Sequence, residues 1–76
     1  MITGVAIRKG IIVVHGAEPC RHHHLLRNVP DPHEWEQGFT DDTRTFYTRR
    51  AAAVLALRSG QVKHLAHKEL FSEDLW

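Results

Sequence analysis

The chain has 76 residues, with ten Lys and Arg against nine Asp and Glu, so its formal net charge is +1 when its seven histidines are neutral. This near balance differs from the strongly basic composition of a sequence-independent nucleic-acid binder. No stretch approaches about 18 apolar residues, and no charged start precedes a long apolar run, so we expect neither a membrane span nor a signal peptide. Cys20 has no internal disulfide partner, which favours a reducing, cytoplasmic location.

The length predicts a single domain over residues 1–76, and the first elements expected are two strands. Two β-branched runs, Ile2–Ile7 and Ile11–His15, flank Arg8-Lys9-Gly10, and Gly10 can supply the positive φ of a tight turn. We therefore expect a β-hairpin whose second strand ends at Gly16.

A helix is expected next. Pro19 suits the first helical turn, where its missing N–H is not needed. The helix should run through about Arg27 and end before Pro30, since the residue that precedes a proline disfavours helical geometry. A loop at residues 30–32 then leads to a polar, weakly patterned stretch.

The second half of the chain predicts a short hairpin followed by a second helix. Phe39-Thr40 and Thr45–Tyr47 flank a turn at Asp41–Arg44. Thr48 is a suitable N-cap for a helix over residues 49–58, and Gly60 fits its C-terminal end. This helix is apolar all round, which predicts a buried central element. The fold class expected is α+β, with residues 72–76 forming a final capped turn.

One histidine of the first predicted helix lies on its apolar face. At 100° per residue, His22 falls in the middle of the face that carries Leu25 and Leu26. His23 lies on the border of that face, whereas His24 lies on the opposite side, with Cys20 and Arg27. His22 is therefore either a hydrogen-bonded core histidine or the inner wall of a site.

Two cations open the second predicted helix. Arg49 and Arg50 follow the N-cap directly, where the helix dipole disfavours positive charge. An anion, or a cluster of the protein's own acids, would explain the pair, and exposed N–H groups at a helix start favour phosphate. The alternative is two solvated arginines whose stems cover apolar surface.

Arginine with histidine is the combination suited to binding or cleaving a phosphodiester. Guanidinium groups match phosphate oxygens, and histidine can move a proton near neutral pH. The predicted catalytic residues are His22 and His23. Arg21 and Arg49 are predicted to hold phosphate, and the aromatic residues Trp35, Tyr47 and Trp76 are candidate base-stacking surfaces. The sequence leaves the cofactor open, and the candidate ligands for a divalent metal are His22, His23, Glu73 and Asp74.

The chain resembles a group of small phage and prophage proteins. The specific matching residues are Arg21-His22-His23 and the terminal run Ser72–Trp76. Gln37-Gly38-Phe39 and Phe46 with Arg49 also match. The resemblance implies a phage accessory protein in the host-cell cytoplasm, of a kind suspected of blocking host defence by capturing or cleaving nucleotide signals. It singles out His22, His23, Arg49 and the terminal run. Ser72 and Trp76 of this run, together with Tyr47, are predicted ligand-binding residues.

The function predicted is binding of a phosphate-bearing nucleotide in a His/Arg pocket. Whether a phosphodiesterase or nuclease-like hydrolysis follows is open. The alternative is a protein-binding inhibitor of a host defence protein, with His22 and Arg49 paired internally to Glu73 and Asp74. We also expect a homo-oligomer, most simply a dimer, because so small a core is marginal and because Trp35, Tyr47 and Trp76 offer aromatic surface.

Overall fold

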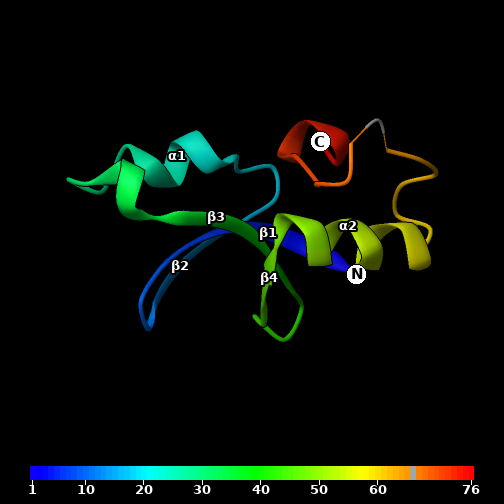
Figure 1. Ribbon diagram of the computed structural model, residues 1–76, viewed down its shortest axis with the longest axis horizontal. Helices are drawn as coiled ribbons and strands as arrows, with labels where there is room; N and C mark the ends of the chain where they lie inside the picture. Colours follow the sequence, from blue (N-terminus) through cyan, green and yellow to red (C-terminus); the bar gives the residue numbers. More distant parts are fainter. Residues whose placement is uncertain (66) are drawn as a thin grey trace.

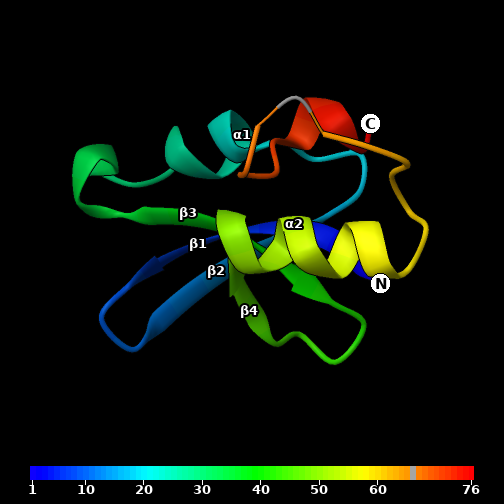
Figure 2. The same cartoon turned by 45° about the vertical axis from the view of Figure 1, so that its right-hand side comes forward.

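The computed structural model describes residues 1–65 and 67–76 and contains one antiparallel sheet with the strand order β2-β1-β3-β4. The elements are β1 (Ile2–Lys9), β2 (Ile12–Ala17), α1 (His22–Leu26), the 3-10 helix η1 (Pro32–Glu34), β3 (Glu36–Asp41), β4 (Phe46–Thr48), α2 (Arg49–Arg58) and the 3-10 helix η2 (Ser72–Asp74). Figures 1 and 2 show that α1, α2 and the C-terminal turn cover the same face of the sheet. The α+β expectation is confirmed.

The N-terminal hairpin is confirmed, and both strands are longer than predicted. The turn closes on the Lys9–Ile12 pair, and Gly10 has φ 60° at its first central position. Gly16 does not end β2, contrary to expectation. A Cβ atom there would lie 3.1 Å from Cβ of Cys20 and 3.2 Å from Cδ2 of Leu25. Gly16 therefore stays within the strand and makes room for the segment that packs over it.

The first helix is shorter than predicted because it begins at His22 and not at Pro19. The chain between β2 and α1 is a turn, since Cys20 donates its backbone N–H to Ala17 O at 3.0 Å. At the helix start, the backbone N–H of Arg21 donates to Nδ1 of His24 at 2.9 Å. The predicted C-terminal end is confirmed, because Arg27 is the C-cap.

The strand β3 is central in the sheet and longer than the two residues that the sequence predicted. Gly38 allows β4 to lie close, because a Cβ atom at this position would be 2.3 Å from the backbone oxygen of Tyr47. Asp41 organises the turn that follows: its carboxylate accepts from Thr43 N and Thr45 N at 3.0 Å each and from the Tyr47 hydroxyl at 2.8 Å. The hydroxyl of Thr43, which donates to the same carboxylate, lowers the pKa of Asp41 most, and with the other donors brings it to about 2.

The helix α2 has the predicted bounds and caps. The Thr48 hydroxyl accepts from Ala51 N at 3.2 Å, and Gly60 has φ 76° beyond the C-terminus. The helix is not buried all round, however, since Val54 is 51% exposed and Leu57 43% exposed. Three alanines form its buried side and let the helix lie close to the sheet. The core comprises Ile2, Val5, Phe39, Ala52, Ala53, Ala56, Val62 and Leu70.

The C-terminal segment contains neither helix nor strand in residues 61–65 and 67–71 and ends in η2. The final turn predicted at residues 72–76 is capped, but not by Ser72. The Asp74 carboxylate caps it instead, by accepting from the backbone N–H of Phe71 at 2.9 Å. The tail is also bonded to the segment that precedes α1, because Nε1 of Trp76 donates to Cys20 O at 2.8 Å.

The three aromatic residues on which the predicted dimer depended are half-buried and bonded within the chain. Nε1 of Trp35 donates to Oδ1 of Asp31 at 2.9 Å, and the Tyr47 hydroxyl donates to Asp41. Trp76 packs against the core. These side chains therefore do not form the exposed aromatic surface expected, and the oligomeric state stays a prediction.

Candidate functional site

A pocket of about 300 Å³ lies where the N-terminal ends of α1 and α2 meet η2, and we call it the His–Arg pocket. Six of the predicted site residues contribute to its wall: Arg21, His22, His23, Arg49, Ser72 and Glu73. Its full lining is Arg21, His22, His23, Leu26, Gln37, Arg49, Phe71, Ser72 and Glu73. Figure 1 shows how η2, at the red end of the chain, lies between α1 and α2 and brings these elements together.

His22 is the buried wall of the pocket, with 6% of its surface exposed. Its Nε2 atom lies 2.7 Å from Gly38 O, and its ring stands edge-on to Phe39 with the centroids 5.0 Å apart. Because a carbonyl oxygen only accepts, Nε2 carries the proton and Nδ1 holds a lone pair in the neutral ring. Burial lowers the pKa of His22, the Gly38 carbonyl opposes this shift, and the charge of Arg49 adds to the lowering. His22 is therefore neutral at pH 7 and suited to accept a hydrogen bond.

Arg49 enters the pocket from the first residue of α2. One terminal nitrogen donates to Oε1 of Gln37 at 2.6 Å, and the guanidinium lies over the Phe71 ring at 4.8 Å from its centroid. Its Nε atom is buried without a hydrogen-bond partner among the described residues. The backbone oxygen of Arg49 accepts from Leu70 N at 3.0 Å, which holds the tail against the helix start. No acid neutralises Arg49 within hydrogen-bonding distance in the described chain.

Arg21 reaches the same pocket from the N-cap of α1. It lies 3.8 Å from a Glu73 carboxylate oxygen and also donates to the backbone oxygen of Trp76. The Glu73 side chain is 73% exposed, and such surface pairs contribute little to stability. Among the pocket residues, two guanidiniums therefore face one carboxylate, and an anionic ligand could replace Glu73 as the partner of Arg21.

The predicted metal ligands do not form one cluster. Within residues 1–65 and 67–76, no group of three or more His, Cys, Asp or Glu side chains is arranged to hold a metal ion. Asp74 caps Phe71 outside the pocket, and Nε2 of His22 is bonded to Gly38. His23 remains on the pocket wall, where its ring lies 4.1 Å from that of His24.

Two predicted ligand-binding residues lie outside the pocket. Tyr47 holds the β3–β4 turn through Asp41, and this carboxylate raises the pKa of Tyr47. Trp76 packs its ring on the core and donates to Cys20 O. These two rings therefore do not line the pocket, and their role as base-stacking surfaces stays a prediction. Phe71 is the pocket's aromatic residue, and its ring is already in contact with Arg49.

Sequence reasoning did not find Gln37, Phe71 or Leu26 as pocket residues. Gln37 is a polar residue inside a strand that was itself predicted too short, so its position relative to Arg49 was not visible. Phe71 belongs to a segment without helical or strand pattern. The available signal for Gln37 was its place in Gln37-Gly38-Phe39, one of the runs that match the phage proteins.

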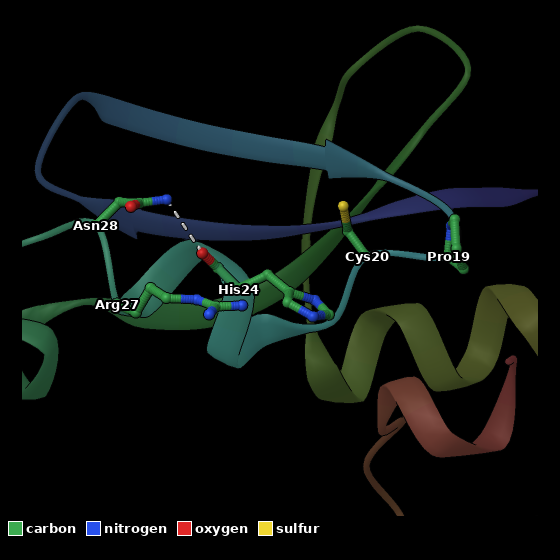
Figure 3. Close-up of a pocket in the computed structure, with 5 residues that line it drawn as sticks. All are labelled: Pro19, Cys20, His24, Arg27 and Asn28. Atoms are coloured by element: carbon green, nitrogen blue, oxygen red, sulfur yellow. Dashed lines mark hydrogen bonds between the residues drawn. The ribbon is translucent and has the colours of Figure 1, made fainter.

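A second, larger pocket of about 530 Å³ lies on the other side of α1. Figure 3 shows its lining residues: Pro19, Cys20, His24, Arg27 and Asn28. The sequence predicted that His24, Arg27 and Cys20 share this side, which the pocket confirms. Asn28 Nδ2 donates to His24 O at 3.2 Å, and Nδ1 of His24 caps the helix. These polar groups serve α1 itself, so we take the His–Arg pocket as the candidate site.

The fold and the pocket define a small α+β protein with paired arginines and histidines around one concave site. The chain belongs to the phage T4 y16D protein family, whose model matches residues 1–76. This match confirms the expected phage protein family. No curated protein and no solved structure matches the chain. Among the described residues, no helix has the length and apolar character needed to cross a bilayer.

Proposed function

We propose that the protein binds the phosphate group of a nucleotide in the His–Arg pocket, in the cytoplasm of the phage-infected cell. One observation carries the proposal. Arg21 and Arg49 are far apart in the sequence but line the same 300 Å³ pocket, and the one carboxylate in its lining belongs to Glu73. With the histidines neutral, these three groups sum to +1, since two positive charges oppose one negative charge.

The chemistry of the pocket favours phosphate over other ligands. Arginine presents several N–H donors in a planar fork that matches phosphate oxygens. Arg49 also begins α2, where the helix dipole and the first backbone N–H groups favour an anion. Neutral His22 adds a hydrogen-bond acceptor in the wall, which suits a ribose hydroxyl or a protonated phosphate oxygen.

The size of the pocket limits what it encloses. A volume of about 300 Å³ is at the lower end for small-molecule sites. It accommodates a phosphate with the adjoining sugar, whereas the base of a nucleotide would extend past His23 at the rim. A proton donor for any hydrolytic step would have to be His23, because Nε2 of His22 donates to Gly38 and its Nδ1 atom only accepts. Binding is therefore the activity that the geometry supports best.

The test is a thermal-shift screen against cyclic dinucleotides, NAD-derived nucleotides and polyphosphates, followed by calorimetric titration of each hit. At a hundredfold excess over Kd, a ligand adds about 2.7 kcal/mol to the free energy of unfolding. For a domain of this size each kcal/mol corresponds to about 4–8 °C in Tm. Arg49→Gln should lose the shift.

Arg58→Gln is the matched control, since Arg58 lies at the other end of the same helix and is exposed. It should keep the full ligand-induced shift. If no anionic nucleotide stabilises the wild type, or if Arg49→Gln responds as strongly as Arg58→Gln, the proposed function is wrong. Product analysis of wild-type and His23→Asn protein then tests for hydrolysis.

A second candidate function is that of a protein-binding inhibitor of a host defence factor. The pairing first expected for it is wrong, because His22 and Arg49 bond to Gly38 and Gln37. A different observation favours it: the exposed side chains Val54 and Leu57 line a groove of about 370 Å³ along α2. For this function, Leu57→Lys should abolish capture of one host protein, whereas Arg49→Gln should not.

A further inference from the structure

The strand β2 lies at one edge of the sheet, and β1 is its one partner strand among the described residues. Because the hairpin closes on the Lys9–Ile12 pair, alternate residues of β2 direct their backbone groups away from β1, beginning with Val13 and His15. None of the hydrogen bonds found within residues 1–65 and 67–76 uses these outward groups of Val13 or His15. This edge is therefore open to another strand.

The side chains at this edge are apolar and exposed. Ile11 is fully exposed, and Ile12 and Val13 expose 57% and 43% of their surface. Figure 1 shows the hairpin tip extending away from the helices, where no other element covers it. Exposed apolar edge strands promote pairing with another chain, so most proteins protect them with lysine, proline, bulges or a covering segment. From Ile12 to Ala17, β2 contains neither a proline nor a residue with a permanent charge.

The opposite edge of the sheet is protected. The strand β4 has three residues, and its partner β3 continues into the turn that Asp41 organises. A short edge strand offers few backbone groups to an incoming chain. Because β2 is longer than β4 and exposes apolar side chains, β2 is the edge better suited to pair with another strand.

We propose that β2 pairs with β2 of a second copy of this chain, antiparallel about a two-fold axis at Val13. In this arrangement the outward N–H and C=O groups of Val13 bond to those of its counterpart, and the exposed Ile11 and Ile12 lie against residues 15 and 14 of the second copy. Antiparallel pairing of identical strands is self-complementary, which is the requirement of a two-fold interface. The result is a continuous eight-stranded sheet.

Charge favours a second copy as the occupant of this edge. The two cations nearest the tip are already neutralised within their own chain: Arg8 lies 2.5 Å from Glu36, and Lys9 pairs with Asp31 and Glu34. Two identical hairpin tips can therefore approach without repulsion between lysines and arginines. The proposal is independent of the His–Arg pocket, whose lining contains no residue of β2.

The first experiment measures mass by light scattering and sedimentation equilibrium from micromolar to millimolar protein. The wild type should approach twice the chain mass of 8.7 kDa, and Val13→Lys should stay a monomer with an unchanged circular dichroism spectrum. Val54→Lys is the matched control, because Val54 is 51% exposed but lies on α2. It should dimerise like the wild type.

The second experiment tests the position of the axis by cross-linking. In a Cys20→Ser background, Val13→Cys should form a disulfide-linked dimer under mild oxidation. Directly opposed residues in a hydrogen-bonded pair have Cα atoms about 5.5 Å apart, a separation that a disulfide accepts. Val54→Cys in the same background should not cross-link. A wild-type monomer at all concentrations, a dimer that survives Val13→Lys, or equal cross-linking of the two variants would overturn the proposal.

Discussion

Gly38 allows β4 to lie close to β3, and its carbonyl oxygen accepts from His22 in the His–Arg pocket. The variant Gly38→Ala tests how much this close approach contributes to stability. The added Cβ atom would lie 2.3 Å from Tyr47 O, whereas ordinary contacts begin near 3.4 Å, so β3 and β4 must separate by about 1 Å. Overpacking of this kind costs about 1–3 kcal/mol, and we expect about 3 kcal/mol because the obstacle is backbone. At about 0.05–0.15 kcal/mol per residue, the free energy of unfolding of the whole chain is about 4–11 kcal/mol. The loss is therefore a large part of the total.

The assay is urea unfolding followed by circular dichroism, with thermal melts in parallel. A loss of about 3 kcal/mol corresponds to about 12–24 °C in Tm for a domain of this size. Gly16→Ala is the control in the same sheet, since its Cβ atom would meet only the side chains of Cys20 and Leu25, at 3.1 and 3.2 Å. Because these contacts require a displacement of only a few tenths of an ångström, its cost should stay below about 1.5 kcal/mol. Equal losses for the two variants, or a loss for Gly38→Ala below about 0.5 kcal/mol, would refute the packing argument.

Two further predictions concern the pocket and the helix that positions Arg49. Burial lowers the pKa of His22, so its neutral form stabilises the fold above about pH 6.5, and the unfolding free energy should fall as pH drops from there towards the lowered pKa. His22→Gln should show a shallower pH dependence in urea titrations at a series of pH values between about 7.5 and 5.5, and an unchanged slope would contradict the assignment. Thr48→Ala removes the acceptor of the Ala51 N–H and should cost about 1 kcal/mol in urea unfolding, whereas Thr48→Ser should retain most of the stability. A Thr48→Ala variant as stable as the wild type would show that the cap does not hold the start of α2.

The features that local chemistry decides could be predicted from the sequence. Gly10 and Gly60 have the positive φ values that their turns require, and Thr48 caps α2 at the predicted residue. Each of these depends on groups within four residues along the chain. The burial of His22 could also be predicted, because helical periodicity places it on the face with Leu25 and Leu26.

Tertiary structure alone decided the length of β3, the outer face of α2 and the partners of the charged groups. Glu36-Gln37-Gly38 lacks an apolar alternation, yet it becomes strand because β1 pairs with all three residues and β4 pairs with Gly38. Arg49 could have met Glu73 or Asp74, and the fold gives it Gln37 and Phe71 instead. The sequence determined which residues are suited to an anion site, because this suitability depends on residue type and on the local helix geometry. Which of them share a pocket depends on contacts between distant segments, and these exist only when the sheet, both helices and the tail pack together.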